Sequence, residues 1–375
     1  MRLSSARIQW VLAVGVVSAA TLVSIASRSS AGRVHAYYIA ADEVEWNYVA
    51  GGRDEIAGAA FQDSAFFTNA PTRPVSSAYK KVLYREYTDS TFRTLKPRPG
   101  EWAHLGFLGP VIRAEVGDTI RIVFRNNGDR PYSVHPHGVF YNKDSEGAPY
   151  SDGTSGADKR DDGVPPGATH RYVWPVPERA GPGPGEGSSV MWMYHSHTDE
   201  TRDVNTGLLG AMIVTARGKA RPDGSPRDVD REVVATFAQV HEEDSWLVGK
   251  NLTLNLDSLR PRANPSQKQN FYPWFVTFTI NGFAHGTLPL ESVTFRRGER
   301  VRWYLMASTN DFDFHTPHWH GNTVLIHGMR MDVTGLMAME MLVADMTPDN
   351  PGTWLFHCHV TFHNAAGMAA RYAVR

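Results

Sequence analysis

The sequence predicts an all-β protein made of two tandem β-sandwich domains. Short runs of β-branched and aromatic residues, such as 119–124, 171–176 and 301–305, are separated by Gly, Pro and Asn, and helical periodicity is scarce. The two halves of the chain also repeat the same series of motifs in the same order. With 375 residues and 42% hydrophobic content, the chain is long enough to bury two cores.

The N-terminus has the layout of an export signal. Arg2 and Arg7 precede a mostly apolar run over 10–26, and small and polar residues follow. We expect a signal peptide over 1–36, cleaved near 34–36, and export to the periplasm or the extracellular space. The apolar run is near the lower length limit of a membrane span, so the alternative is an uncleaved membrane anchor.

The internal repeat defines the domains. The first half contains GDTIRIVF at 117–124, HPHG at 135–138 and WMYHSH at 192–197, and the second contains GERVRWYL at 298–305, HWHG at 318–321 and WLFHCH at 354–359. Between the halves, residues 218–229 carry the Gly, Pro and charged residues typical of a linker. We therefore expect domain 1 over 37–217 and domain 2 over 230–375.

Charge and cysteine content limit the functional classes. Lys and Arg number 38 against 39 Asp and Glu, so nothing indicates the basic surface of a nucleic-acid-binding protein. The chain has a single cysteine, Cys358, which cannot form an intramolecular disulfide. A lone cysteine is usually a small buried hydrophobic residue. Because His357 and His359 flank Cys358, we interpret it as a metal thiolate instead.

Ten of the 16 histidines fall into four clusters. These clusters are His135 with His137; His195 with His197; His315, His318 and His320; and His357, His359 and His363. Residues i and i+2 of a strand point to the same side, so each His-x-His pair can direct both imidazoles at one site. Four such pairs in duplicated positions predict a site with eight imidazole ligands.

The remaining ligands indicate a second kind of site. His315, Cys358, His363 and Met368 supply two nitrogens, one thiolate and one thioether, which is the ligand set of a blue-copper electron-transfer centre. The alternative is a catalytic cysteine with a histidine base, which would leave the other histidine pairs without a role.

The sequence resembles the multicopper oxidase family over nearly the whole chain after the export signal. The first half is similar to the ceruloplasmin and coagulation factor V/VIII branch through YREYTD at 84–89, LGPVIRAEVGD at 108–118 and RPYS at 130–133. The size and the histidine layout resemble the bacterial two-domain laccases. The resemblance implies two cupredoxin-like Greek-key sandwiches.

The resemblance also implies a role for each ligand and a path for the electrons. Copper would be present as one type 1, one type 2 and two type 3 ions per chain. Type 2 copper would bind His135 and His318; the type 3 pair would bind His137, His195, His197, His320, His357 and His359; and type 1 copper would bind His315, Cys358, His363 and Met368. Electrons would enter at His363, pass through Cys358 and reach dioxygen at the three-copper cluster.

Domain 1 departs from this pattern. Aligning the two halves places Ser196 where Cys358 stands, Arg202 near the position of His363 and Leu208 near that of Met368. Domain 1 therefore lacks the soft ligands of a blue-copper centre. We expect one such centre per chain, in domain 2.

Two further residues are candidates for roles at the cluster. Asp152 is a candidate proton donor, and Tyr141, four residues after His137, is a candidate electron donor. Their alternatives are a turn aspartate and a core aromatic side chain. A calcium loop is the third candidate, because Lys143, Glu146, Asp152, Asp158, Asp161 and Asp162 resemble one in the ceruloplasmin branch. The alternative is a solvated acidic loop.

The cluster histidines come equally from both domains, so the cluster must lie at an interface between domains. By resemblance, domain 1 of one chain would face domain 2 of the next, which predicts a head-to-tail homotrimer with the cluster between subunits. The partners are then dioxygen and a small-molecule reductant, with no nucleic acid.

For the function, we expect a laccase-like oxidase of phenols or other small reductants. The alternative is a ferroxidase or another metal oxidase. Phe362 stands where that branch has an acidic residue, and the aromatic residues Trp274, Phe275 and Phe278 occupy the segment where acidic and histidine ligands are expected. A copper nitrite reductase, which needs its blue copper in domain 1, and a non-catalytic binding protein, which would have lost its ligands, are less favoured.

Overall fold

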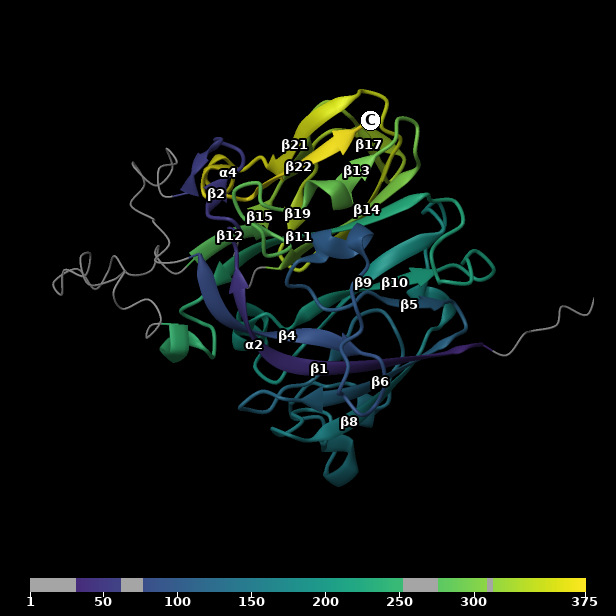
Figure 1. Cartoon of the computed structure of the whole chain (residues 1–375). Helices are drawn as coiled ribbons and strands as arrows, with labels where there is room; N and C mark the ends of the chain where they lie inside the picture. Colours follow the sequence, from purple (N-terminus) through teal and green to yellow (C-terminus); the bar gives the residue numbers. More distant parts are fainter. Residues whose placement is uncertain (1–31, 62–76, 252–275, 309–312) are drawn as a thin grey trace, which may run out of the picture. The chain divides into compact units, whose positions relative to one another are not determined.

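The computed structural model describes residues 32–61, 77–251, 276–308 and 313–375 (Figure 1). The predicted signal peptide, 1–36, lies largely outside the described residues. Its last three residues, 34–36, are the start of strand β1 (Val34–Asn47), which pairs in parallel with β6. Among the helices within the described ranges, none is long and apolar enough to cross a membrane.

The first half of the chain forms a sandwich of two four-stranded sheets. One sheet has the order β4 (Ala78–Tyr87), β1, β6 (Thr119–Asn126), β8 (Thr169–Pro175). The other has the order β5 (Ile112–Glu115), β10 (Leu209–Thr215), β9 (Ser189–His195), β7 (His135–Pro136). Buried side chains alternate with more exposed ones along β6, as expected for a strand with one face in a core. Tyr84, Trp174 and Tyr194 pack in that core.

The second half forms a sandwich of a six-stranded and a four-stranded sheet. The larger sheet has the order β12 (Val276–Ile280), β11 (Arg231–His241), β14 (Val301–Ser308), β20 (Met341–Met346), β17 (Val324–Ile326), β18 (Met329–Met331). The smaller has the order β13 (Thr294–Phe295), β22 (Ala369–Val374), β21 (Gly352–Cys358), β16 (Pro317–Trp319). Trp303 packs edge-on against Trp319 and tilted against Phe356 in the core.

Short elements complete both halves. They include the hairpin β2 (Arg53–Asp54) and β3 (Ala59–Ala60), the pair β15 (Phe314–His315) and β19 (Leu336–Met337), the helices α2 (Glu200–Thr206) and α4 (Thr361–Ala365), and short 3-10 helices at Gly100–Leu105, Lys143–Ser145, Gly156–Lys159, Glu178–Ala180 and Leu290–Val293. Helix α2 connects β9 to β10, and α4 connects β21 to β22. In each half, the strand that carries the third motif, WMYHSH at 192–197 or WLFHCH at 354–359, is therefore followed by a short helix.

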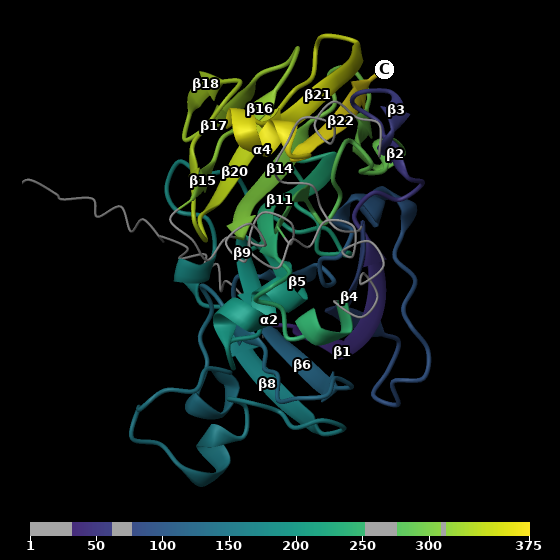
Figure 2. The ribbon, with the colours of Figure 1, turned by 90° about the vertical axis from the view of Figure 1, so that its left-hand side faces the viewer.

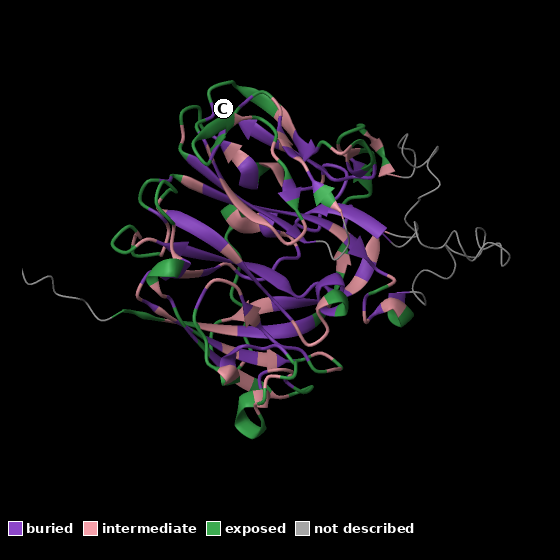
Figure 3. Ribbon diagram, turned by 180° about the vertical axis from the view of Figure 1, so that it is seen from behind, coloured by how far each residue is buried: buried purple, intermediate pink, exposed green. Residues whose placement is uncertain are grey.

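The two sandwiches share a buried contact. A third hydrophobic cluster combines Met191 and Ile213 from the first sandwich with Val234 and Tyr304 from the second. Buried and partly buried polar contacts join the halves as well. Two hydrogen bonds link Arg113 to Glu232, at 3.1 and 2.8 Å, and Arg302 donates to Ser189 Oγ at 2.8 Å. Figure 3 shows buried residues along the strands and exposed residues mainly in the loops.

The predicted linker, 218–229, lies between the last strand of the first half and the first strand of the second. Strand β10 ends at Thr215 and β11 begins at Arg231. Within this connection, an isolated bridge pairs Ala220 with Pro226, so the segment folds back on itself. The domain limits 37–217 and 230–375 stay a prediction.

Candidate metal centres

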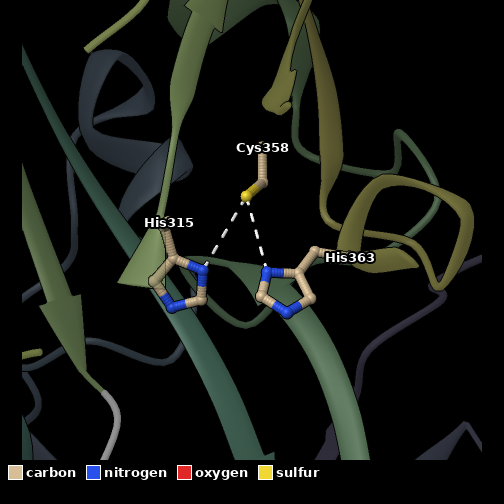
Figure 4. A group of neighbouring side chains, drawn as sticks. All are labelled: His315, Cys358 and His363. Carbon is tan, nitrogen blue, oxygen red and sulfur yellow. Dashed lines mark hydrogen bonds between the residues drawn. The ribbon is translucent and has the colours of Figure 1, made fainter. Parts of the chain in front are cut away.

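Cys358 lies at the end of β21 with two histidines facing its sulfur (Figure 4). Its Sγ lies 3.8 Å from Nδ1 of His315, on β15, and 3.5 Å from Nδ1 of His363, in α4. All three side chains are buried, and the backbone N–H of Thr316 donates to Sγ at 3.3 Å. The sequence-predicted nitrogen and thiolate ligands therefore meet at one point. In Figure 2, α4 and β16 lie beside β21.

This arrangement fits a single metal ion. Metal–nitrogen and metal–sulfur bonds of about 2.0 and 2.3 Å separate the two ligand atoms by roughly 3.5–3.8 Å at trigonal or tetrahedral angles. Burial lowers the pKa of His315 to about 4, so its imidazole is neutral and able to bind metal at neutral pH. Burial raises the pKa of the Cys358 thiol, and a bound cation would reverse this by stabilising the thiolate.

Met368 is held next to this group by the backbone. Its N–H donates to the carbonyl of His363 at 2.9 Å, and its own carbonyl accepts from the N–H of Cys358 at 3.0 Å. The Met368 side chain is fully buried in the core of the second sandwich, which also contains Cys358. The fourth predicted ligand is therefore close to the other three in the fold.

Asp313 is a residue at this site that sequence reasoning missed. Its carboxylate lies 2.9 Å from Nε2 of His363, the ring nitrogen that does not face the sulfur. The side chain of Asp313 is only partly buried, whereas that of His363 is almost fully buried. The signal in the sequence is weak but present. Asp313 stands two residues before His315, at the spacing that brings side chains to one side of an extended segment.

Aromatic side chains surround the same histidine. The ring of Phe278, on β12, lies 5.0 Å from the ring of His363 and 5.4 Å from that of Phe362. Phe362 and Phe314 are each 48% exposed, which is high for residues of this size. Trp274 and Phe275, which stand with Phe278 in one aromatic segment of the sequence, lie outside the described residues.

The four second-half cluster histidines form a separate group. Nε2 of His357 lies 3.2 Å from Nδ1 of His318 and 3.1 Å from Nε2 of His320. The ring of His359 stacks on that of His318 at 4.8 Å. Nδ1–H of His357 donates to the carbonyl of Cys358, which leaves Nε2 free to bind a metal. Burial lowers the pKa of His357 to about 4, so that nitrogen is unprotonated at neutral pH.

The four first-half cluster histidines form a matching group. Nε2 of His137 lies 3.1 Å from Nε2 of His195, and the rings of His135 and His197 are 5.1 Å apart. Nδ1–H of His135 donates to the carbonyl of Glu146, at 2.6 Å, and Nδ1–H of His195 donates to a backbone carbonyl at 3.1 Å. Both contacts leave Nε2 as the metal-binding nitrogen. Burial lowers the pKa of His137 to about 4.

Each half of the chain thus holds one group of four histidines. Within the described residues, which include all eight, no hydrogen bond or ring contact joins a histidine of one group to a histidine of the other. The nitrogen distances of 3.1–3.2 Å place these imidazoles close enough to bind one metal ion or two adjacent ions. Each group is therefore compact enough to hold a metal ion, and the copper assignments of its histidines stay predictions.

The first sandwich fills the position equivalent to the cysteine site with hydrogen bonds. Ser196, which aligns with Cys358, is fully buried and donates to Asp203 at 2.6 Å. Trp246 donates to the other oxygen of the same carboxylate at 2.9 Å. Leu208 belongs to the hydrophobic core, and the guanidinium of Arg202 stacks over Trp246. None of these four side chains, at 196, 202, 203 and 208, offers a soft ligand.

Tyr141 and Asp152 lie in different surroundings. The ring of Tyr141 packs edge-on against that of His135 at 5.8 Å, and burial raises the pKa of its phenol. Asp152 instead contacts Lys159 at 2.9 Å and Lys143 at 3.1 Å. The hydrogen bond from Lys159 is the largest cause that lowers the pKa of Asp152. The structure gives Asp152 no contact with a cluster histidine among the described residues. Both proposed roles stay predictions.

The candidate calcium loop is crosslinked by lysines. Lys143 pairs with Glu146 at 2.5 Å and Lys159 pairs with Asp162 at 3.1 Å, in addition to their contacts with Asp152. The remaining two acidic residues behave differently: Asp161 is buried and accepts the N–H of Gly147, and Asp158 is exposed. A calcium ion would have to displace both ammonium groups from the carboxylates. Calcium binding stays a prediction.

Comparisons with known proteins identify the family. A family model described as multicopper oxidase matches residues 102–219, and a second with the same description matches residues 260–375. Two solved structures share the fold at TM-scores of 0.54 and 0.56: a multicopper oxidase, 17% identical, and the blue copper oxidase from Nitrosomonas europaea, 15% identical. The matches cover 92% and 91% of this chain, and 89% and 86% of those chains.

Curated relatives are considerably more similar in sequence. Human ferroxidase HEPHL1 is 42% identical over 90% of this chain, rat hephaestin 38% over 94%, and human ceruloplasmin 37% over 91%. The aligned part is 29%, 30% and 32% of those proteins, so the chain spans about a third of their length. These relatives agree with the ceruloplasmin-like motifs of the first half. The chain belongs to the multicopper oxidase family, and its cofactor is therefore copper.

Proposed function

We propose that the chain oxidises ferrous ions one electron at a time and passes the electrons to dioxygen, which is reduced to water. The observation that carries this proposal is the Asp313 carboxylate, 2.9 Å from Nε2 of His363 and partly exposed. A carboxylate there attracts a cation to the outer edge of the imidazole ligand and offers it an oxygen ligand. The similarity to human ferroxidase HEPHL1 supports this substrate.

An organic reductant is the second candidate, as the aromatic residues of the sequence first suggested. Phe362 and Phe314 expose about half of their surface, and Phe278 packs edge-on against Phe362. Such rings could stack with a phenol. The ferroxidase-named relative and Asp313 favour iron, so the ranking drawn from the sequence is reversed here.

The proposed copper inventory follows the two kinds of site. His315, Cys358, His363 and Met368 would hold type 1 copper; His135 and His318 would hold type 2 copper; and His137, His195, His197, His320, His357 and His359 would hold the type 3 pair. Bound copper would supply one-electron acceptance at the first site and reduction of dioxygen at the others. Burial lowers the pKa of His137, His315 and His357, and Nδ1–H bonds to backbone carbonyls fix the tautomers of His135 and His357.

The cluster itself would be completed between chains. Each group of four histidines is assembled within its own half of the chain, and no contact joins the two groups within the described residues. A head-to-tail homotrimer would bring the first-half group of one subunit against the second-half group of the next. We propose this exported trimer as the active form.

Oxygen uptake by the copper-loaded protein tests the substrate. We expect turnover with Fe2+, and Asp313→Asn should lower kcat/KM for Fe2+ by about tenfold or more, equivalent to about 1.4 kcal/mol. Asp349→Asn, which removes an exposed carboxylate elsewhere in the second half, serves as the matched control and should retain the kcat/KM of the unaltered protein. Robust turnover of hydroquinone with none of Fe2+ would contradict the proposal and support the organic reductant.

A further inference from the structure

A further group of metal-ligating side chains lies at the end of β11. One ligand atom from each of His241, Glu243 and Asp244 lies within 4.8 Å of those of the other two. Nδ1 of His241 is 3.0 Å from Oε1 of Glu243. His241 is buried, Glu243 is half-buried and Asp244 is exposed. The group therefore extends from the protein interior to the solvent, which gives an ion a route of entry.

This group lies on the same face of the sheet as the cysteine site. Residues of β11 alternate between two cores: Val233, Ala235 and Phe237 belong to that of the second sandwich, and Val234, Ala238 and Val240 to the cluster between the halves. Because side chains of a strand alternate in direction, Gln239 and His241 continue the first of these faces. Phe237 on this face lies 6.0 Å, ring to ring, from His315.

Strand pairing places the group near His363. His241 pairs with Val276 of β12, and Gln239 pairs with Phe278, whose ring lies 5.0 Å from that of His363. His241 is two residues from Gln239, which is about 7 Å along the strand. The ring of Phe278 would therefore lie between an ion at His241 and His363, the residue at which electrons are proposed to enter.

Two oxygens in this region lack a hydrogen-bond donor. Oε2 of Glu243 and Oε1 of Gln239 are buried, and neither has a partner among the residues that the structure describes. A buried oxygen without a partner is unfavourable, more so on a carboxylate. A cation held by Glu243 would satisfy its oxygen. One imidazole and two carboxylates are a ligand set suited to divalent first-row metals.

We propose that His241, Glu243 and Asp244 bind a divalent transition-metal ion. The role of this site rests on the proposed oxidation of iron. The site captures Fe2+ from solution and holds it on the face of the sheet that leads to His363. It lies apart from the copper ligands, and its three side chains belong to one turn that follows one strand.

Titration of the copper-loaded full chain with Co2+, followed by calorimetry, tests the site. Co2+ resembles Fe2+ in charge and ligand preference. We expect the unaltered chain to bind one Co2+. The affinity for this ion should fall at least about tenfold in His241→Asn and in Glu243→Gln, and by less in Asp244→Asn. The matched control is His327→Asn, an exposed histidine on the turn between β17 and β18, which should bind Co2+ like the unaltered chain.

Steady-state kinetics give a second measurement on the same variants. His241→Asn and Glu243→Gln should raise KM for Fe2+ about tenfold while retaining kcat, because the ligands of the copper sites are untouched. Melting temperature and visible absorption report whether the buried substitutions disturb the fold. Asp244→Asn alters an exposed side chain, so it tests the site without a change in core packing.

The outcomes separate this site from the proposed function. Equal Co2+ affinity in the unaltered chain and all three variants would overturn the site. Oxidation of Fe2+ with an unchanged KM in the variants would overturn its role in iron capture, although the oxidase function would stand. A His241-dependent Co2+ site in a protein that oxidises hydroquinone but not Fe2+ would support the site and refute the proposed substrate.

Discussion

At the scale of single residues, Cys358 and its neighbour His357 connect the two kinds of proposed metal site. The sulfur of Cys358 faces His315 and His363, whereas His357 faces His318 and His320. Adjacent side chains of a strand point to opposite faces, so consecutive ligands of β21 can serve different sites. The hydrogen bond from His357 to the Cys358 carbonyl, at 2.8 Å, adds a second link within the same dipeptide.

Replacing the sulfur tests this arrangement. Cys358→Ser should abolish intense blue absorption and oxidation of the substrate, because a serine hydroxyl does not provide a soft thiolate ligand. Most of the copper bound by the histidine groups should remain, since their ligands are unchanged. Copper content and the visible spectrum are the measurements. Blue colour retained at full strength would refute the assignment of Cys358 to a type 1 site.

Gly367, next to Met368, is a residue whose conformation and contacts both require glycine. Its φ is +111°, and a Cβ there would lie 2.6 Å from Nε2 of His285. Gly367→Ala should therefore destabilise the protein by about 1–3 kcal/mol and shift the blue absorption as Met368 moves. Urea unfolding and visible spectra provide the test. Gly335→Ala, where a Cβ meets nothing within 4 Å, is the control.

At the scale of elements, the repeated motifs predicted which ligand-bearing strands pair, but not the contacts between distant segments. The pairing of β16 with β21 brings His318 opposite His357, as the duplicated motifs imply. Asp313 is different, because its contact with His363 depends on how the segment before β15 meets α4. His241 lies outside the four histidine clusters of the sequence, because its proposed role depends on the pairing of β11 with β12. Sequence spacing encodes proximity within a strand, whereas these contacts require the tertiary arrangement.

The β2–β3 hairpin contributes a pH-dependent contact to the second sandwich. Asp54 lies 3.1 Å from Nδ1 of His285, whose backbone N–H donates to Gly367. Burial raises the pKa of Asp54, but hydrogen bonds from His285 and from the N–H groups of Ile56 and Ala57 together lower it by more. The net effect is a lowered pKa. The folded-state pKa is therefore below the unfolded value of 3.8.

The lowered pKa of Asp54 determines how its contribution to stability should depend on pH. The stability that ionised Asp54 contributes should be fully present above the unfolded pKa and lost as the pH falls through the folded pKa. Asp54→Asn should lower the urea midpoint at pH 6, and the difference from the unaltered protein should shrink towards pH 3. Unfolding curves across this range measure it. A difference that is constant with pH would show that ionised Asp54 does not stabilise the hairpin contact.

At the scale of the whole molecule, two half-clusters in one chain raise the question of where a complete cluster forms. The buried core between the halves holds the two sandwiches together through residues such as Ile213 and Met306. The histidine groups take no part in that core, and within the described part of the chain they do not contact each other. Oligomerisation would therefore be a condition for oxygen chemistry rather than an addition to it.

Mixing two inactive variants decides between a cluster within one chain and a cluster between chains. One variant, His135→Ala with His137→Ala, lacks first-half ligands, and the other, His318→Ala with His320→Ala, lacks second-half ligands. Each alone should be inactive. If neighbouring subunits share the cluster, each mixed trimer contains one interface of three with a complete ligand set, so oxygen uptake should return to roughly a quarter to a third of the unaltered value per chain. A cluster within one chain predicts no recovery at any ratio, because every chain then lacks two ligands. Copper counting on the separated oligomers should show the same recovery, and an active, fully copper-loaded monomer of the unaltered protein would refute the shared cluster directly.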